Sequence, residues 1–326
     1  MNSGFKILGT GSYLPEKVLT NFDLEKMVDT SDQWITERTG IKERRIAHPR
    51  EASSDLGAKA ALRALEMAKI SPQEIDLIIV ATITPDMFFP STACFIQKKI
   101  GAWNAAVMDV LAACSGFVYG LVTAQGLMST GGFKKILVIA AETLSKITDW
   151  EDRSTCVLLG DGAGACVIVP DREKGIISYH LGGNGSLGHL LFLPGGGSRL
   201  PATQDSVNKK KHFLKMKGNE LFKVAVRVLS ESALKVMEKA GVSPEEISLF
   251  IPHQANWRIM KACAQRIGIP VEKIYVTVDK YGNTSAATIP IALDEAVREG
   301  KVKEGDLILL DAFGGGLTWG ACLLRW

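Results

Sequence analysis

The sequence predicts an α/β protein made of two related halves. Short, continuously apolar segments, typical of strands buried on both faces, alternate with segments whose apolar residues recur at helical spacing. In addition, Ser71–Ile79 recurs as Ser243–Ile251, and a similar order of elements follows each copy. Copies roughly 170 residues apart are too widely spaced for a solenoid. We therefore expect a duplicated domain, with its halves at residues 1–172 and 173–326.

The elements of the first half follow from its apolar patterns. Strands are expected at 6–10, 75–81, 105–111 and 135–141, and helices at 92–100 and 117–129. Ser53-Ser54-Asp55 predicts the start of another helix, because short polar side chains cap helix N-termini. The run Gly160–Ala165 lacks the Lys-Ser/Thr of a phosphate-binding loop, so it predicts a sharp turn between two strands.

The second half opens with residues 171–217, the least regular part of the chain, rich in glycine, proline and lysine. Lys209-Lys210-Lys211 predicts a solvated loop there, with a docking patch for an acidic partner as the alternative. A long helix is expected at 218–240. The duplication then predicts strands at 249–251, 274–278 and 307–310, helices at 257–267 and 286–299, and turns at 282–285 and 314–316.

Composition excludes several classes of protein. The chain has 326 residues, a net charge of +3 and no apolar run near the ~18 residues of a membrane span, so neither nucleic-acid binding nor a membrane span is expected. The N-terminus lacks the apolar segment of a signal peptide. The six cysteines form no C-x-x-C pair, and the five histidines lack ligand spacing. We therefore expect a cytoplasmic enzyme with reduced thiols and no metal site.

Cys114 is the candidate nucleophile. It follows the apolar run 105–111 and precedes the helical pattern 117–129, which places its thiol at a helix start. Backbone N–H groups at a helix N-terminus favour negative charge, so a thiolate is expected to form there more easily than in free cysteine. The alternative is a buried structural thiol, since free cysteines are among the most buried residues.

The duplication supplies partners for Cys114. The turn at Cys114 corresponds to Asn283-Thr284-Ser285, and the loop at Ala81-Thr82 corresponds to His253-Gln254. Parallel strands gather such loops at one end of a sheet, so we expect Cys114, His253 and Asn283 to lie close together. A Cys–His pair is the usual activated thiol. Asn283 donates hydrogen bonds but cannot remove a proton, which suits an enolate or a thioester carbonyl.

The charged stretch 36–45 allows two interpretations. A charged stretch of this kind usually forms a solvent-exposed face of the protein. With Trp34 four residues before Arg38, it can instead stack on a planar, phosphate-bearing ligand.

Together these motifs resemble the β-ketoacyl-acyl-carrier-protein synthase III family of the thiolase superfamily, over nearly the whole chain. The motifs that carry the resemblance are Asp29–Ile35 with Arg38–Ile41, Ala112–Phe117, Gly160–Ala165, Gly218–Phe222, Pro252–Asn256, Tyr281–Ser285 and Phe313–Gly320. The resemblance implies a thiolase-like fold, in which two α/β halves with five-stranded mixed sheets form an αβαβα layered arrangement. It also implies the initiating condensing enzyme of type II fatty-acid synthesis, an acyltransferase that acts as a homodimer.

By that resemblance, Cys114 takes an acyl group from acyl-coenzyme A (CoA). His253 and Asn283 then hold malonyl-acyl-carrier protein, which loses CO2 and condenses with the acyl group to give 3-oxoacyl-acyl-carrier protein. The N–H groups of Cys114 and Gly315 would form the oxyanion hole. No cofactor is implied, because CoA enters as a thioester substrate.

The resemblance also assigns the residues that bind substrates. The implied CoA contacts are Thr30, Trp34, Arg38, Arg153, Gly218, Asn219, Phe222, Ala255 and Asn256. Arg258 would dock the carrier protein, with Lys223, Gln254 and Lys261 as neighbours. Phe89 would enter the acyl pocket of the partner in the homodimer.

Two alternatives stay open. One is a related starter-unit or secondary-metabolite (polyketide or quinolone) synthase with the same three residues. The other is a non-catalytic acyl-carrier-binding paralogue, against which the presence of Cys114, His253 and Asn283 argues. The loop 183–217 departs from the family pattern and leaves the size of the starter acyl group open.

Overall fold

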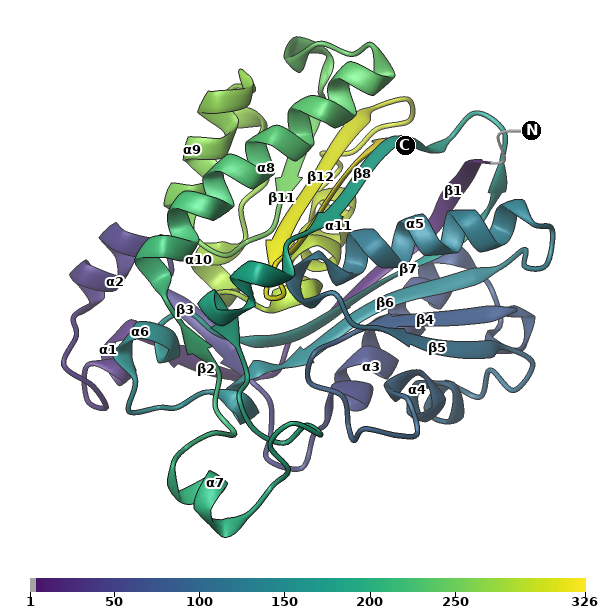
Figure 1. Cartoon of the computed structure of the whole chain (residues 1–326). Helices are drawn as coiled ribbons and strands as arrows, with labels where there is room; N and C mark the ends of the chain where they lie inside the picture. The colour runs from purple at the N-terminus through teal and green to yellow at the C-terminus, as the bar shows by residue number, and fades with distance from the viewer. Residues whose placement is uncertain (1–3) are drawn as a thin grey trace.

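The computed structural model describes residues 4–326 and stacks two β-sheets with helices outside and between them (Figure 1). The first sheet has the strand order β1-β7-β6-β4-β5 and the second the order β11-β12-β13-β8. In the first sheet β4 pairs parallel with β5 and β6, whereas β7 runs antiparallel to β1 and β6. The strands are β1 (Gly4–Tyr13), β4 (Leu77–Ala81), β5 (Ala106–Val110), β6 (Ile136–Thr143), β7 (Asp161–Asp171), β8 (Gly175–Gly183), β11 (Leu249–Pro252), β12 (Leu307–Gly314) and β13 (Thr318–Arg325).

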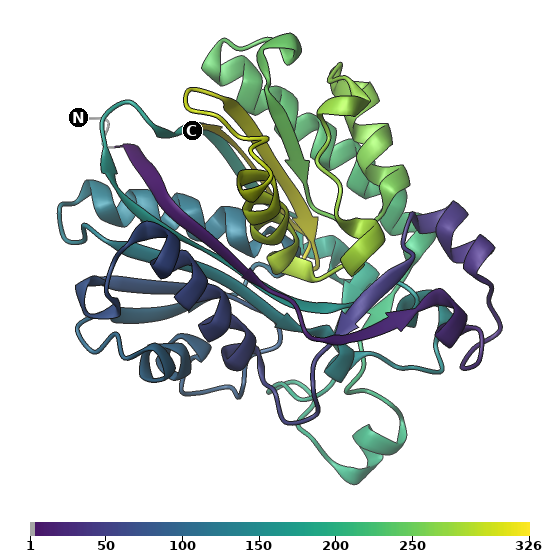
Figure 2. The ribbon, with the colours of Figure 1, turned by 180° about the vertical axis from the view of Figure 1, so that it is seen from behind.

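The helices complete the expected αβαβα layers. α3 (Ser53–Ala68) and α4 (Thr92–Ile100) cover the outer face of the first sheet, and α8 (Gly218–Ala240) and α9 (Trp257–Ile267) cover the outer face of the second (Figure 1). α5 (Gly116–Ser129) and α11 (Thr288–Arg298) lie between the sheets, as the view from behind also shows (Figure 2). The layered arrangement and the thiolase-like fold are thus confirmed.

The central layer joins the two halves. Its apolar cluster takes Phe117 and Leu121 from α5, Ile289 and Leu293 from α11, and side chains from the inner faces of both sheets. Each sheet takes its strands from one half of the sequence. The division into domains at residue 172 stays a prediction, because the halves share this core.

The second sheet has four strands instead of the expected five. The predicted strand 274–278 is reduced to a single bridge between Phe250 and Ile274. The reason is that the Gln254 side chain accepts from the Thr277 N–H at 2.9 Å and donates to the Tyr275 carbonyl at 3.1 Å. These backbone groups are bonded to a side chain instead of a neighbouring strand, and α10 (Val278–Tyr281) begins at once.

The glycine run at 160–165 does not form the predicted turn. Its last five residues open β7, and the strand continues to Asp171. The glycines are needed for close packing, because a Cβ atom at Gly164 would lie 2.7 Å from the Cβ of Pro290 in α11. β7 therefore allows the central helix to approach the first sheet.

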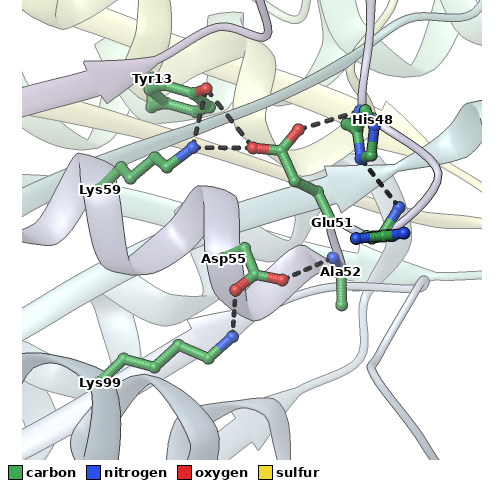
Figure 3. Close-up of polar contacts among 8 residues, drawn as sticks. Tyr13, His48, Glu51, Ala52, Asp55, Lys59 and Lys99 are labelled. Atoms are coloured by element: carbon green, nitrogen blue, oxygen red, sulfur yellow. Dashed lines mark hydrogen bonds and ion pairs between the residues drawn. The ribbon is translucent and has the colours of Figure 1, made fainter.

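The start of α3 also differs in detail from the expected Ser-Ser-Asp cap. The helix begins at Ser53, and Asp55 accepts from the N–H of the N-cap residue Ala52 at 2.8 Å. Figure 3 shows this contact beside the ion pair of Asp55 with Lys99. The Ser53 hydroxyl instead donates to the Thr84 carbonyl at 2.6 Å, which ties α3 to the loop after β4.

The remaining elements lie at one end of the sheets. They are β2 (Lys17–Thr20), β3 (Glu43–Ile46), β9 (Leu191–Phe192), β10 (Lys215–Met216), α1 (Asn21–Leu24), α2 (Asp32–Thr39), α6 (Arg153–Cys156) and α7 (Gln204–Asn208). α7 stands on a long loop that extends from the body (Figure 1). In that loop Lys210 pairs with Asp149 at 3.1 Å, so the lysine run is partly engaged within the chain. No helix within 4–326 combines the length and apolarity needed to cross a bilayer.

Candidate active site

Cys114 lies in a 3-10 turn, Ala113–Ser115, between β5 and α5. Its side chain is buried, with 7% of its surface exposed. Ala113 has φ +45°, a left-handed conformation that is uncommon for a residue other than glycine. A strained backbone of this kind often marks a functional turn. Here the turn lies directly before the central helix α5.

The second half repeats this turn at Ser285–Ala287, directly before α11. Ser285 has φ +51°, so it matches Ala113 in conformation as well as in position. The two turns pack against each other, and the second also packs on β6. The duplication therefore brings the Ser285–Ala287 turn against the turn of Cys114. The meeting of Cys114 with Asn283 and His253 stays a prediction.

The glycine turn after β12 lies against the nucleophile. A Cβ atom at Gly314 would be 2.5 Å from the Cys114 nitrogen and 3.0 Å from its Cβ, so only glycine fits there. Thr318 fixes the two segments together, because its Oγ1 lies 2.8 Å from the Ala112 carbonyl and 3.0 Å from the Ser115 hydroxyl. The oxyanion-hole role of Gly315 stays a prediction, but the neighbouring backbone is in place.

His253 follows β11 and is buried. Its N–H donates to the Asp311 carbonyl at 2.8 Å, and its Nδ1 lies 2.7 Å from the Thr288 hydroxyl. Burial lowers the pKa of His253 to about 3. The imidazole is therefore neutral at physiological pH, with its Nε2 atom left for a ligand.

Asn283 is held from both sides. Its backbone N–H donates to the Leu158 carbonyl at 2.8 Å, and its carbonyl accepts from Gly160 at 3.0 Å. Its side-chain Oδ1 accepts from the Ser285 N–H at 2.8 Å. Since the amide oxygen is occupied, the Nδ2 group is left as a hydrogen-bond donor, which is what the predicted role requires.

The expected lowering of the Cys114 pKa is wrong for the unliganded protein. Burial, together with the nearby Glu142 carboxylate, raises the pKa of the thiol to about 12. The Ser285 hydroxyl and the backbone act in the opposite direction but do not offset burial. The Cys114 thiol is therefore protonated at neutral pH, so a nucleophilic role would need an acceptor for its proton.

Glu142 is a candidate residue that sequence reasoning missed. It is the penultimate residue of the buried strand β6 and is fully buried. Thr84 donates to its Oε2 at 2.6 Å, and Thr82 donates at 3.2 Å. Burial raises the pKa of Glu142 to about 7 despite these donors. The signal available in the sequence was a carboxylate closing an otherwise apolar strand.

Several predicted CoA contacts gather around Trp34. The guanidinium of Arg153 lies 5.1 Å from the Trp34 ring, and that of Arg38 lies 5.6 Å from it. Arg153 also donates to the Asp29 carbonyl at 2.8 Å, beside Thr30. An indole with two cations over it fits an adenine ring with phosphates, which favours the stacking interpretation over a merely solvated face.

A second group of these residues adjoins the first. Asn256 caps α9 and donates through Nδ2 to the Arg38 carbonyl at 3.0 Å. Arg258 stacks on Phe222, with 5.6 Å between the guanidinium and the ring. In the sequence, Ala255 directly precedes Asn256. Gly218 and Asn219 are the first two residues of α8, which also carries Phe222. The chain thus brings most of the predicted contacts to one edge of the second half.

The predicted carrier-docking residues separate into two groups. Lys223, Arg258 and Lys261 are exposed on α8 and α9. Gln254 is fully buried, and its amide bonds to Pro252, Tyr275 and Thr277. A side chain so enclosed cannot touch a protein partner, so the docking role expected for Gln254 is wrong and the residue is structural.

Phe89 lies on the loop between β4 and α4 with 83% of its surface exposed. Met87, Phe88 and Leu111 are exposed as well. Phe89 therefore lies outside the core of its own chain. This exposure is what the predicted contact of Phe89 with a partner subunit requires.

The fold and its strand-end turns define a condensing enzyme of the thiolase type. Residues 108–185 match the family model described as 3-oxoacyl-[acyl-carrier-protein] synthase III, and residues 237–326 match the model of its C-terminal part. The chain belongs to the 3-oxoacyl-[acyl-carrier-protein] synthase III family, and it is an acyltransferase, an initiating condensing enzyme of fatty-acid synthesis.

Curated relatives and solved structures agree with this assignment. Proteins named β-ketoacyl-[acyl-carrier-protein] synthase III from Caldanaerobacter subterraneus subsp. tengcongensis and Clostridioides difficile are 56% and 54% identical to the chain. These alignments cover 98% and 100% of this chain and 97% and 99% of the relatives. The crystal structure of the synthase III from Aquifex aeolicus has a TM-score of 0.92 at 55% identity and covers 99% of this chain and 100% of its own.

Proposed function

We propose that the enzyme joins an acyl group from acyl-CoA to a malonyl group carried by acyl-carrier protein, with Cys114 as the acyl carrier. One observation carries the proposal: the buried Cys114 turn packs against both the Gly314 backbone and the Ser285–Ala287 turn. A thiol enclosed by N–H donors suits a thioester whose carbonyl oxygen gains negative charge during transfer.

The first half-reaction transfers the acyl group. The Cys114 sulfur bonds to the thioester carbonyl of the acyl donor, the bond to the CoA sulfur breaks, and CoA leaves as a thiolate that takes a proton from solvent. The N–H groups of Cys114 and Gly315 hold the oxygen of the tetrahedral intermediate. In other enzymes the loss of one such donor costs about 3 kcal/mol of transition-state stabilisation.

The second half-reaction forms the carbon–carbon bond. His253 and Asn283 donate to the malonyl thioester carbonyl, and loss of CO2 leaves its electron pair in an enolate. The enolate carbon attacks the acyl carbonyl on Cys114, and the carbon–sulfur bond breaks. The product is 3-oxoacyl-acyl-carrier protein, and the Cys114 sulfur is released. Donors without a proton-removing base suit this step, because decarboxylation itself supplies the carbanion.

The surroundings of the site suggest how the two substrates enter. Trp34, Arg38 and Arg153 would hold the adenine and phosphates of CoA, with Asn256 and Phe222 in the adjoining group of contacts. Lys223, Arg258 and Lys261 form an exposed basic surface for an acidic carrier protein. The scheme uses no cofactor, because CoA enters as part of a substrate.

We further propose a cytoplasmic homodimer. The exposed apolar side chains of Met87, Phe88, Phe89 and Leu111 form a surface that a second copy would cover. In that arrangement Phe89 would reach the partner's acyl pocket and help set the size of the starter group.

Mass spectrometry tests the proposal directly. After incubation with acetyl-CoA or a branched acyl-CoA, one acyl group is expected on the peptide that carries Cys114. Cys114→Ala should lose the adduct, whereas Cys94→Ala, which alters the half-buried cysteine of α4, should retain it. The absence of an adduct with every short acyl donor would refute the mechanism. The preferred donor would also separate fatty-acid initiation from a specialised starter-unit synthase.

A further inference from the structure

A buried carboxylate lies on the side of the Cys114 turn away from the glycine loop. Glu142 accepts at Oε2 from Thr84 at 2.6 Å and from Thr82 at 3.2 Å, and the Ile83 N–H lies 3.2 Å from Oε2 and 3.3 Å from Oε1. The surface of Glu142 is fully covered. The loop after β4 therefore supplies three hydrogen-bond donors to one oxygen. These donors orient the carboxylate, but all three are uncharged, so none forms an ion pair with it.

Ser285 connects this carboxylate to the nucleophile. Its turn packs both on β6, which carries Glu142, and on the turn of Cys114. The pKa shifts agree with this packing, because the hydroxyl of Ser285 lowers the pKa of both the Cys114 thiol and the Glu142 carboxyl. Ser285 is 1% exposed, and its hydroxyl makes no hydrogen bond within residues 4–326. A buried hydroxyl without a partner is rare in folded proteins and needs a functional reason.

The elements around Glu142 carry few other titratable groups. Cys114 faces it from the Ala113–Ser115 turn, whereas the loop after β4 and the turn before α11 present Thr82, Thr84 and Ser285. On β7 the residue opposite Glu142 is Gly162. Asp161 pairs with Thr143, on the other face of the sheet, and accepts from Ala47 and Ser145. Glu142 is thus positioned to exchange a proton with Cys114 through Ser285.

We propose that Glu142 stores the proton of the Cys114 thiol while the acyl group is bound, and that the Ser285 hydroxyl relays it. The inference rests on the function proposed above. His253 does not serve this purpose, because it is assigned to hold the malonyl carbonyl and its hydroxyl contact is to Thr288.

The proton balance closes over one cycle. During acylation Ser285 takes the thiol proton and passes its own proton to the Glu142 carboxylate, as the carbon–sulfur bond forms and CoA departs as a thiolate. The thiolate of CoA takes a proton from solvent. When condensation breaks the Cys114 thioester, the sulfur leaves as a thiolate, and the proton returns from Glu142 through Ser285. The cycle as a whole consumes one solvent proton, which ends on CoA.

Glu142→Gln is the first test. A glutamine carbonyl can keep all three donors that reach Oε2, but the amide cannot accept the proton. In stopped-flow measurements of CoA release, the variant is expected to acylate about 100-fold more slowly at pH 7. Its acylation rate should rise continuously with hydroxide concentration, without the inflection near pH 7 expected for the wild type. The rate of iodoacetamide modification of Cys114 should show the same change in pH profile.

Ser285→Ala is the second test, and alanine suits the backbone because Ala113 has the same left-handed conformation. It should slow acylation to a similar degree. Asp294→Asn is the matched control: Asp294 is also buried and accepts from two hydroxyls, those of Thr10 and Ser12, but lies away from Cys114. It should keep the wild-type pH profile.

The outcomes separate the inference from the proposed function. If the wild type forms no acyl-Cys114, the proposed function fails. If the wild type is acylated but Glu142→Gln or Ser285→Ala keeps the wild-type rate and pH profile, the proton relay is wrong. The rate of malonyl decarboxylation, which does not use the thiol proton, should stay within about twofold of the wild type in both variants. A parallel loss of decarboxylation would show a structural defect and contradict the relay.

Discussion

The Nδ1 atom of His253 lies 2.7 Å from the hydroxyl of Thr288, and the same hydroxyl lies 3.0 Å from the Ser285 carbonyl. A carbonyl can only accept, and a hydroxyl has one hydrogen, so Thr288 donates either to the Ser285 carbonyl, while accepting from Nδ1–H, or to Nδ1. If Thr288 donates to Nδ1, the hydrogen of the neutral imidazole sits on Nε2, where it can be donated to a substrate carbonyl. The proposed role of His253 therefore makes Thr288 the residue that sets its tautomer.

Thr288→Val removes the hydroxyl and keeps the side-chain shape, so it tests this relationship. Malonyl decarboxylation is expected to fall about tenfold, the size of one lost hydrogen bond, while acylation of Cys114 stays within about twofold. Thr288→Ser should restore decarboxylation. Nitrogen-15 spectra of His253 should show Nε2 protonated in the wild type and a mixture in Thr288→Val. Equal losses in both half-reactions would contradict a role in positioning His253.

The Gly314 backbone gives a second prediction. A Cβ atom there would lie 2.5 Å from the Cys114 nitrogen, a distance that real Cβ contacts essentially never show. Gly314→Ala should therefore displace the nucleophile and lower the acylation rate by at least about 100-fold, as removal of an oxyanion-hole donor does. Single-turnover release of CoA measures this rate.

Gly126→Ala is the control for that substitution. Gly126 lies inside α5, and a Cβ atom there meets nothing within 4 Å. Alanine favours a helix interior over glycine by up to ~1 kcal/mol, so the variant should be slightly more stable and fully active. Full activity in Gly314→Ala would show that the glycine loop does not position Cys114.

The sequence predicted the layered fold and the packing of the two equivalent turns at Cys114 and Ser285, because duplication and apolar alternation follow directly from residue order. Other features depend on side-chain contacts that no pattern shows. Gln254 matched a docking motif, yet it is buried and replaces strand pairing at Tyr275 and Thr277. The pKa of Cys114 was predicted from its helix start alone, whereas burial dominates it. Glu142 looked like the end of an apolar strand, and only tertiary packing brings it to the nucleophile.

The cation–π cluster at Trp34 gives a third prediction. Arg153 stacks on Trp34 at 5.1 Å and donates to the Asp29 carbonyl at 2.8 Å. If this cluster holds CoA, Arg153→Gln should raise the KM for acyl-CoA about tenfold, the value of one charge-assisted contact, with kcat nearly unchanged. Steady-state kinetics with acyl-CoA as the varied substrate measure the effect.

Arg63→Gln is a closely matched control for Arg153. Arg63 stacks on Tyr13 at 5.6 Å and donates to the Ser12 carbonyl at 2.6 Å, in a part of α3 away from the Trp34 cluster. Its KM for acyl-CoA should equal that of the wild type. An equal rise in both variants would assign the effect to general electrostatics or stability instead of a CoA site.

The buried titratable groups predict how stability depends on pH. Burial raises the pKa of Glu142 from its ordinary value of 4.5 to about 7. Between these pH values the folded protein binds the proton that the unfolded chain releases, so Glu142 contributes stability that is fully present below pH 4.5 and lost as the pH rises through 7. His253 acts in the opposite sense: its pKa falls from 6.5 to about 3, so it opposes folding increasingly as the pH drops below 6.5.

Comparison of the wild type with Glu142→Gln isolates the contribution of Glu142 to the pH dependence of stability, because both proteins contain His253. Relative to Glu142→Gln, the wild type should gain about 1–3 kcal/mol in free energy of unfolding between pH 7.5 and pH 5. Urea unfolding at fixed protein concentration measures it, since self-association would otherwise shift the midpoint. Glu66→Gln, which changes an exposed glutamate of α3, should run parallel to the wild type. A constant difference between wild type and Glu142→Gln across this range would mean that Glu142 stays ionised in the folded protein, and the carboxylate would then be unsuited to hold the Cys114 proton.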